Sequence, residues 1–394
     1  MLELIINKNK DLETICLVEN GKLLEKYENN EETMKNRLEG NIYAGKVSDI
    51  VSGMQSAFVD YGDSRKGLLH LKDAMPQVDE KIEKKELSTK KISDVVKQNQ
   101  KILIQIKKDS NERKGAKIST HISIPSRYIV YMPNTDIITI SQKIEDEKRR
   151  KELLELVKSN VTKGNGAVVR TFAFDANDEE IIKDIERCEK KWKQILSNYE
   201  KSNVLELIYQ SESVQAKILI DLKVDKVITN NQQEFEALKQ LIQFEEIKGV
   251  KLEYSPSKDL LEMYDLNNQI NKAKNRKIWL NCGGFITIDK TEALTAIDVN
   301  TGKFTGKSDL ESTIFKVNKE ATIEIAKQLR LHDIGGIVII DYIDMHIPEN
   351  NEKIESLLKE ELKKDRAKTQ VEGFTKLNLM ELTRKHICSH LNEV

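Results

Sequence analysis

Two apolar stretches in the last third of the chain each finish in an aspartate. ALTAID ends at Asp298, and IVIID ends at Asp341. A buried strand gains no packing from a terminal charge, whereas the active sites of α/β sheets gather at the carboxyl ends of strands. If the two strands are neighbours, the two carboxylates converge at one edge of the sheet. We therefore expect a functional site at Asp298 and Asp341.

Two carboxylates held this close favour a cation between them, because each raises the pKa of the other. Mg²⁺ binds one or two carboxylates together with water and phosphate oxygens. It then activates water and neutralises charge on a phosphodiester during in-line attack. Asn300 follows Asp298 by two residues and could orient the water or a phosphate oxygen. The pattern predicts metal-assisted hydrolysis of a phosphodiester.

The same residues also allow a plainer interpretation. The segment DVNTG is good turn chemistry, because Asp, Asn and Gly all favour turns. DYID could be a strand end with an adjacent cap. Three other acids nearby, Asp289, Glu292 and Asp344, compete for the role of metal ligand. Spacing alone leaves these alternatives open.

The elements around the aspartates read as an α/β unit. Strands are expected at 285–289, 292–298 and 337–341. A helix is expected to begin at a capping box of Ser308 and Glu311 and to end at Gly335-Gly336. An amphipathic helix is expected at 351–368. This alternation would bring the carboxyl ends of two strands to one edge of a sheet.

From Gly40 the chain changes to short alternating strands separated by glycines, which is typical of a small closed barrel. Residues 40–130 carry 17 Lys and Arg against 11 Asp and Glu, a net charge of +6. Basic barrels bind single-stranded nucleic acid by stacking bases on aromatic rings and by pairing lysines with phosphates. The candidates for these contacts are Tyr43, Phe58, Tyr61, His70 and Lys114. For any single aromatic, a position in the core is the plainer interpretation.

A glycine turn in VTKGNGAVVRTFAF leads into a strand that ends at Arg170 and Thr171. An arginine fork and a hydroxyl together suit a phosphate group, although an arginine at a strand end is also common on any surface. A strand-helix-strand pattern follows over 214–254, with 214–222 read as a strand and 233–242 as a helix. Three further strands are expected at 2–7, 14–19 and 22–27.

Composition places limits on the class of protein. A chain of 394 residues exceeds one hydrophobic core and suggests two to four folding units. Apolar residues make up 39% and charged residues 33%, with a net charge of −1. The four cysteines form no C-x-x-C pair, and no apolar run reaches membrane-spanning length. We expect a cytoplasmic globular protein without a membrane span.

Several long segments resemble the bacterial ribonuclease E/G family. GGFITIDKTEALTAIDVNTGKFTG and IFKVNKEATIEIAKQLRLHDIGGIVIIDYIDM resemble the catalytic core of that family, and GNIYAGKVSDIVSGMQSAFVDYGDSRKGLLHL resembles its S1-type barrel. KGAKISTHISIPSRYIVYMPN, AVVRT and DRAKTQVEGFTKLNLMELTRK match in order and spacing. The resemblance covers nearly the whole chain. Within the family, the shorter ribonuclease G type is the more similar.

The resemblance implies an α/β (α+β) multidomain fold. An RNase H-like subdomain would be built from residues 1–35 and 212–278. An S1-type OB barrel (36–125) and a 5′-phosphate sensor region (126–211) would be inserted into it. A DNase I-like catalytic subdomain would follow at 279–394.

The resemblance also implies a function. Members of the family are metal-dependent endoribonucleases that cleave single-stranded, A/U-rich RNA and leave 5′-phosphate and 3′-hydroxyl ends. A 5′-monophosphate on the substrate stimulates them, and they act in rRNA maturation and mRNA decay. The expected cofactor is Mg²⁺, with Mn²⁺ as a substitute.

Carried over residue by residue, the family pattern assigns roles at seven positions. The metal-binding aspartates fall on Asp298 and Asp341, and the supporting catalytic asparagine falls on Asn300. The RNA contacts of the barrel fall on Phe58 and Lys114, and the 5′-phosphate sensor falls on Arg170 and Thr171.

Three departures from the family pattern matter. Where the family pattern has a second aromatic in the barrel, this chain has Leu68. Where the family pattern has an arginine near the sensor, this chain has Gln142. The C-P-x-C zinc hook is absent, with Cys388 the one cysteine in that neighbourhood. Because paired hooks share one structural Zn²⁺ between two subunits in the family, we do not expect a zinc-linked dimer here, and a homodimer of another kind stays open.

Two other functions remain to be weighed. One is a non-catalytic RNA-binding protein that uses the OB barrel, and the presence of Asp298, Asn300 and Asp341 speaks against it. The other is a metal nuclease that acts on DNA, and the resemblance of the barrel and of the sensor speaks against that.

Overall fold

The chain leaves its first folding unit after three strands and returns to it after residue 221. In this computed structural model, one unit comprises Met1–Thr33 and Leu222–Val394, and the other comprises Met34–Asp221. The structure describes residues 1–30, 37–76, 89–110, 114–256, 259–302 and 310–387. The predicted N-cap Ser308 and Cys388 lie outside these ranges. The second unit is therefore an insertion into the first.

The first sheet of the discontinuous unit combines both ends of that insertion. Its strands are β1 (Leu2–Asn9), β2 (Leu12–Glu19), β3 (Lys22–Asn29), β14 (Lys226–Thr229) and β15 (Lys251–Tyr254), in the order β15-β14-β1-β2-β3. The N-terminal strands form an antiparallel meander, whereas β14 runs parallel to β1 and β15 runs parallel to β14. The helix α8 (Gln232–Phe244) connects the two parallel strands, as parallel pairing requires. The three predicted N-terminal strands are confirmed.

The inserted unit begins with a closed barrel of five strands. These are β4 (Ile42–Val51), β5 (Ser56–Asp60), β6 (Gly67–His70), β7 (Lys101–Lys108) and β8 (Lys117–Ser119). They follow the order β4-β5-β6-β8-β7, and pairing of β4 with β7 closes the ring. At Gly45, a Cβ would come within 2.6 Å of the Val59 side chain, so only glycine fits this corner of the interior. The barrel fits an OB-like domain, as the sequence predicts.

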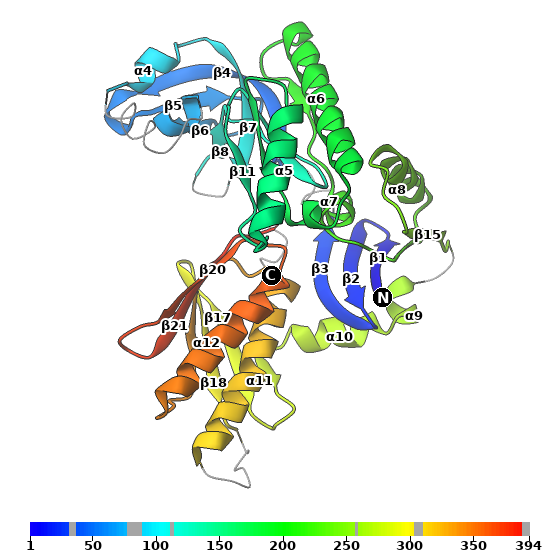
Figure 1. Ribbon diagram of the computed structural model, residues 1–394, viewed down its shortest axis with the longest axis vertical. Coiled ribbons are helices and arrows are strands. Elements are labelled where there is room, and N and C mark those ends of the chain that lie inside the picture. The colour runs from blue at the N-terminus through cyan, green and yellow to red at the C-terminus, as the bar shows by residue number, and fades with distance from the viewer. Residues whose placement is uncertain (31–36, 77–88, 111–113, 257–258, 303–309, 388–394) are drawn as a thin grey trace. The chain divides into compact units, whose positions relative to one another are not determined.

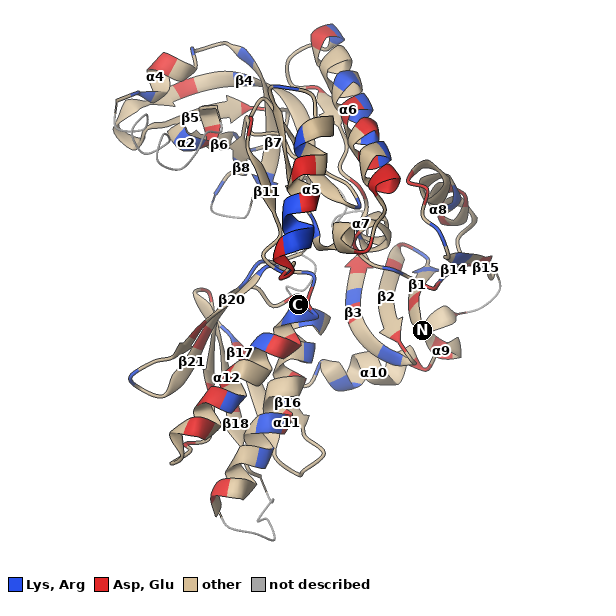
Figure 2. Ribbon diagram, in the orientation of Figure 1, with Lys and Arg blue, Asp and Glu red and all other residues tan. Residues whose placement is uncertain are grey.

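The rest of the inserted unit is a small sheet covered by two helices (Figure 1). The sheet has the order β11-β12-β10-β9, formed by β9 (Ile124–Pro125), β10 (Ile129–Pro133), β11 (Ile138–Ile140) and β12 (Asn165–Val169). The helices are α5 (Glu147–Asn160) and α6 (Asp178–Lys201). Helix α6 buries Ile181, Ile185 and Trp192. Charges of both signs follow one another along its other faces (Figure 2).

One secondary-structure prediction is wrong. Residues 214–222 were expected to be a strand, but Val214–Asp221 forms the helix α7. The run Ile218-Leu219-Ile220 is buried in either conformation, and a short apolar run does not by itself distinguish a buried helix from a strand. The neighbouring predictions hold, because 226–229 is a strand and 232–244 is a helix.

The second sheet of the discontinuous unit carries the two aspartates. Its strands are β16 (Lys277–Trp279), β17 (Phe285–Lys290), β18 (Leu294–Asn300), β19 (Gly336–Asp341), β20 (Thr369–Phe374) and β21 (Leu379–Arg384), in the order β16-β17-β18-β19-β21-β20. The helix α11 (Leu310–Leu331) carries the chain from β18 to the parallel strand β19. The three predicted strands and this helix are confirmed.

One face of this second sheet is covered and the other is open. The helices α11 and α12 (Pro348–Lys363) pack together, and their apolar residues join the buried side chains of Ile297, Val299, Val338 and Ile340 in one core (Figure 1). Alternate residues of β18 and β19 are exposed instead. Because these residues are exposed, side chains on the open face can reach a ligand.

Helix α12 ends at Lys363, five residues before the predicted end at 368.

Candidate nuclease site

Asp298 and Asp341 lie directly opposite each other in neighbouring parallel strands. The register of β18 and β19 runs from Leu294 opposite Ile337 to Asp298 opposite Asp341. Because neighbouring strands are about 4.8 Å apart and paired residues point to the same face, the two carboxylates share one patch of surface. Both residues are exposed on the open face of the sheet. The predicted convergence of the two strand ends is therefore present.

The surroundings of the pair concentrate negative charge. The Asn300 side chain donates from Nδ2 to Asp298 Oδ2 over 2.5 Å, which fixes one carboxylate oxygen. Partial burial, followed by repulsion from the carboxylates of Asp298 and Asp344, raises the pKa of Asp341. Asp344 in turn accepts a hydrogen bond of 2.7 Å from Asn378 Nδ2. A cation at this position would relieve the repulsion.

The positions and partners of the three competing acids distinguish them as metal ligands. Arg276 binds Asp289 with two hydrogen bonds of 2.6 and 2.7 Å, so that carboxylate already has a cationic partner. Glu292 lies in the turn between β17 and β18, at the opposite end of β18 from Asp298. Asp344 interacts electrostatically with Asp341 and stays close enough to assist it.

The donor set fits a small, hard cation. No group of three or more His, Cys, Asp or Glu side chains that could hold a metal occurs in the part of the chain that the structure describes. Zinc and calcium sites in proteins use more protein ligands than this pair supplies. Mg²⁺ keeps several waters and takes one or two carboxylates. Asp298 and Asp341 meet that requirement, with Asn300 positioning one of them.

Of the two predicted RNA contacts on the barrel, one is exposed and the other is half-buried. Phe58 is half-buried and lies opposite Leu68, which lies opposite Lys117 in the next strand. Lys114 is exposed. A Cβ on the following Gly115 would come within 2.0 Å of the Lys66 carbonyl oxygen, so the backbone there runs against the start of β6.

The three other stacking candidates are buried to different degrees. Tyr61 is 1% exposed and packs against the half-buried Tyr43 with ring centroids 5.3 Å apart. His70 is half-buried, and its Nδ1 lies 2.7 Å from the hydroxyl of Ser56. The core interpretation holds for Tyr61, and Phe58 stays the candidate that the family pattern implies for base stacking.

The predicted sensor arginine is held by two oxygen atoms of its own unit. Arg170 donates from Nη1 to the Ser126 carbonyl oxygen over 2.6 Å and from Nη2 to Asp221 Oδ1 over 2.5 Å. The Thr171 hydroxyl lies 3.0 Å from the Ser141 hydroxyl. Gln142, which follows Ser141, is exposed. These two contacts orient the guanidinium and use two of its five N–H donors.

Comparison with known proteins identifies the family of this chain. The profile of the ribonuclease E/G family matches residues 123–387. The chain belongs to the ribonuclease E/G family. It is 35% identical over 390 residues to "Ribonuclease G" of Salmonella typhimurium, covering 97% of this chain and 79% of that protein. It is 36% identical to "Ribonuclease G" of Haemophilus influenzae, covering 100% and 81%. Identity to "Ribonuclease E" of Nostoc is 30%, over 90% of this chain and 52% of that protein.

Sequence reasoning did not identify two carboxylates that bind the segments around the predicted sensor arginine of this family member. Asp221 binds Arg170 directly. Asp184 is fully buried in α6 and accepts hydrogen bonds from the Ser126 hydroxyl (2.6 Å) and the Tyr128 amide (2.9 Å). The sequence carries a sign of the second one, because Asp184 falls on the apolar stripe of α6 that Ile181 and Ile185 define. A charge on such a stripe indicates a buried hydrogen-bonding role.

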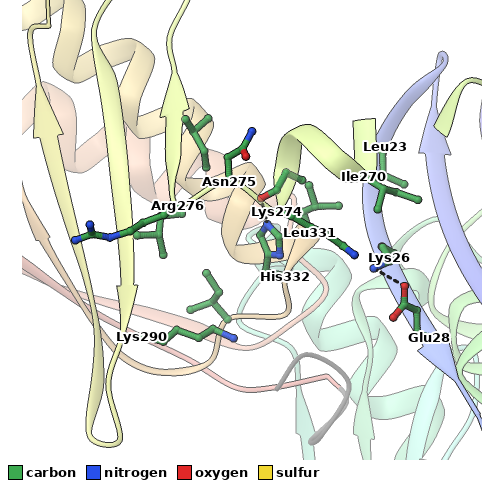
Figure 3. Close-up of a pocket in the computed structure, with 14 residues that line it drawn as sticks. Leu23, Lys26, Glu28, Ile270, Lys274, Asn275, Arg276, Lys290, Leu331 and His332 are labelled. Carbon is green, nitrogen blue, oxygen red and sulfur yellow. Dashed lines mark hydrogen bonds and ion pairs between the residues drawn. The ribbon is translucent and has the colours of Figure 1, made fainter. Parts of the chain in front are cut away.

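One cavity of the ribonuclease E/G chain lies away from Asp298 and Asp341. It has a volume of about 510 Å³ and is lined by β3, β16, β17, the end of α10 (Leu266–Ala273) and the end of α11 (Figure 3). Lys26 pairs there with Glu28 at 2.7 Å, and His332 Nε2 lies 3.0 Å from the Ala273 carbonyl oxygen. None of the candidate site residues lines it. The candidate chemistry therefore sits on an open sheet face, which admits the middle of a long polymer.

Among the described residues of this family member, no helix combines the length and the apolar character that crossing a membrane requires.

Proposed function

We propose that this chain is an endoribonuclease that depends on a divalent metal and hydrolyses single-stranded RNA at the open face of its second sheet. The observation that carries the proposal is the register of Asp298 opposite Asp341, with Asn300 hydrogen-bonded to Asp298. The names of its relatives, Ribonuclease G and Ribonuclease E, support the same reaction class. The domain boundaries and the RNase H-like and DNase I-like assignments implied by the family are part of this proposal.

The residues of the site divide the work of the proposed reaction. A bound Mg²⁺ or Mn²⁺ supplies charge neutralisation at the phosphodiester and a water of lowered pKa. Asp298 and Asp341 hold that ion, and Asn300 fixes the carboxylate of Asp298 in one orientation. The exposed position of both aspartates allows an RNA strand to cross the face without threading an end. Cleavage would leave a 5′-phosphate and a 3′-hydroxyl.

The inserted unit would supply substrate selection. Phe58 and Lys114 on the barrel suit a base and a phosphate of single-stranded, A/U-rich RNA. Arg170 and Thr171 would contact a 5′-monophosphate, the arginine through the N–H donors that its contacts with Asp221 and Ser126 leave over. Stimulation by a 5′-monophosphate and roles in rRNA maturation and mRNA decay belong to this proposal.

The test of the proposed function is cleavage by the wild-type chain. An A/U-rich oligoribonucleotide with a 5′-monophosphate is incubated with Mg²⁺, with and without EDTA, beside a DNA strand of the same sequence. We expect internal cuts in the RNA that EDTA abolishes. RNA binding by the barrel without any cleavage would instead support a non-catalytic RNA-binding protein, and equal cleavage of DNA would contradict the RNA specificity.

Replacing Arg170 is expected to weaken the preference for 5′-monophosphorylated RNA. A hydrogen bond to a charged group contributes about 1.5–3 kcal/mol, so Arg170→Ala should reduce the ratio of rates for 5′-monophosphate over 5′-hydroxyl RNA by roughly tenfold or more. The measurement is initial cleavage rates on the two substrates. The rate on 5′-hydroxyl RNA serves as the internal control and should stay close to wild type. An unchanged ratio would remove Arg170 from the sensor.

Metal binding is expected to weaken as the solution becomes acidic. The pKa of Asp341 is raised in the folded protein, so the carboxylate takes up a proton at higher pH than in the unfolded chain. The ionised pair then lowers stability as pH rises through that window, and a bound cation reverses the effect. We expect Mg²⁺ to raise the melting temperature more at neutral than at mildly acidic pH. Equal increases in both buffers would argue against metal binding by Asp341.

A further inference from the structure

An exposed tryptophan packs against a half-buried phenylalanine at the edge of the second sheet. Trp279 in the edge strand β16 is 58% exposed, although tryptophan is among the residues with the most to gain from burial. Its ring packs edge-on against Phe285 of β17, with centroids 5.3 Å apart and an interplanar angle of 61°. Large apolar side chains left in solvent often mark a binding surface.

The strand register places this pair beside the candidate nuclease site. Trp279 lies opposite Phe285, and Phe285 lies opposite Asn300. The next row on the same face runs from Lys277 through Thr287 to Asp298. Since neighbouring strands are about 4.8 Å apart, the Trp279 backbone lies about 10 Å from that of Asn300 across two strand spacings. The two rings and the carboxylates therefore belong to adjacent rows of one surface.

A lysine and a glycine complete the surface. Lys277 Nζ lies 4.4 Å from the centroid of the Trp279 ring and 3.5 Å from that of Phe285. Gly302 lies two residues after Asn300 and has φ +60°. A Cβ there would sit 3.4 Å from the Trp279 ring and 3.3 Å from the Phe285 ring. The backbone just after β18, the strand that carries Asp298 and Asn300, thus packs on the rings without placing a side chain over them.

We propose that Lys277, Trp279 and Phe285 form a stacking platform for a nucleobase of the RNA next to the scissile phosphate. Aromatic rings stack any base through its π-face, and a nearby ammonium pairs with the backbone phosphate. This proposal rests on the proposed function, because that function makes the neighbouring pair, Asp298 and Asp341, the metal-binding site. The platform adds affinity without sequence readout and holds the strand flat against the open face.

RNA is the occupant that the charges favour. The ammonium of Lys277 lies over the two rings. The adjacent row of the sheet ends in two carboxylates suited to a metal ion. A phosphate backbone on this surface would therefore have a cationic partner on each side. Lys277 has no carboxylate partner among the residues that the structure describes. A protein partner would need a larger apolar surface than these two rings provide.

Tryptophan fluorescence tests the platform directly. The chain has two tryptophans, and Trp192 is 7% exposed in the inserted unit, so a Trp192→Phe variant leaves Trp279 as the single emitter. In this variant, with Asp298→Asn added to prevent cutting, an A/U-rich oligoribonucleotide in Mg²⁺ should quench the emission. Binding followed by anisotropy without any quenching would overturn the platform. A matching oligonucleotide with one abasic position beside the cleavage site should quench less, and equal quenching would also count against it.

Kinetics give a second, independent readout. Stacking on one ring is worth roughly tenfold in affinity, so Trp279→Ala should raise KM about tenfold with kcat little changed, and Trp279→Phe should restore most of the loss. Tyr254→Ala is the matched control. Tyr254 is an exposed aromatic residue in the other sheet of the same unit, and it packs against Phe235 of α8. A loss in Tyr254→Ala equal to that in Trp279→Ala would contradict the proposal.

The two proposals fail separately. Quenching of Trp279 by RNA in a chain that never cleaves RNA would support the platform and contradict the proposed function. Normal cleavage with wild-type KM in Trp279→Ala would support the function and contradict the platform.

Discussion

Asp298→Asn and Asp341→Asn should each lower the rate of RNA cleavage by roughly a thousandfold or more, because a catalytic metal ion contributes several kcal/mol to stabilising the transition state. RNA binding should persist, since the barrel residues belong to the inserted unit and are unchanged. The measurement combines single-turnover cleavage of an A/U-rich oligoribonucleotide with binding followed by anisotropy. Full cleavage by either variant would remove that aspartate from the site.

A matched control lies one strand away. Asp289 is on β17 in the same sheet, and its carboxylate is neutralised by Arg276 instead of facing another acid. Asp289→Asn should therefore cleave at the wild-type rate. Asp344→Asn should fall between the two cases, because Asp344 acts on Asp341 through its charge.

The stability of the same variants separates function from folding. Removing one carboxylate relieves the repulsion that raises the pKa of Asp341. Without metal, Asp298→Asn should therefore be at least as stable as the wild type, and Mg²⁺ should stabilise it less. A large loss of stability in the metal-free variant would indicate a structural role for Asp298 instead of a functional one.

The sequence predicts the strands of the candidate site because their chemistry is local. The apolar runs that end at Asp298 and Asp341 predict two strands, although a continuous run suggests burial on both faces and each strand is exposed on one. That these strands are neighbours is a long-range fact, and periodicity does not contain it. Here the parallel crossover through α11 supplies the pairing.

Other features depend on contacts that no local pattern reveals. The helix at Val214–Asp221 was read as a strand because its apolar run suits both conformations. Asp221 meets Arg170 across 51 residues of sequence. The sequence does not reveal Trp279 as a binding residue either, because a tryptophan in an edge strand normally serves packing. Its proposed role follows only from the strand register that places it near Asn300.

The buried arginine of the second sheet is expected to carry the largest effect on stability. Arg384 has a fully buried side chain and donates 2.7 Å hydrogen bonds to Asp365 and Asp333, which are also buried. Arg384→Met would remove the guanidinium that pairs with both buried carboxylates. Breaking a buried ion pair from one side typically costs about 3–5 kcal/mol, so the free energy of unfolding of this unit should fall by that amount.

The control for this prediction uses the same substitution at an exposed pair. Arg276 binds Asp289 of β17 with two hydrogen bonds of 2.6 and 2.7 Å, but in solvent. Arg276→Met should change stability little, because exposed ion pairs are screened by water. Urea unfolding in the Trp192→Phe background follows the unit through Trp279 fluorescence. Equal losses in the two arginine variants would mean that lost packing, and not the uncompensated charge of Asp333 and Asp365, sets the stability of the strand that pairs with β19.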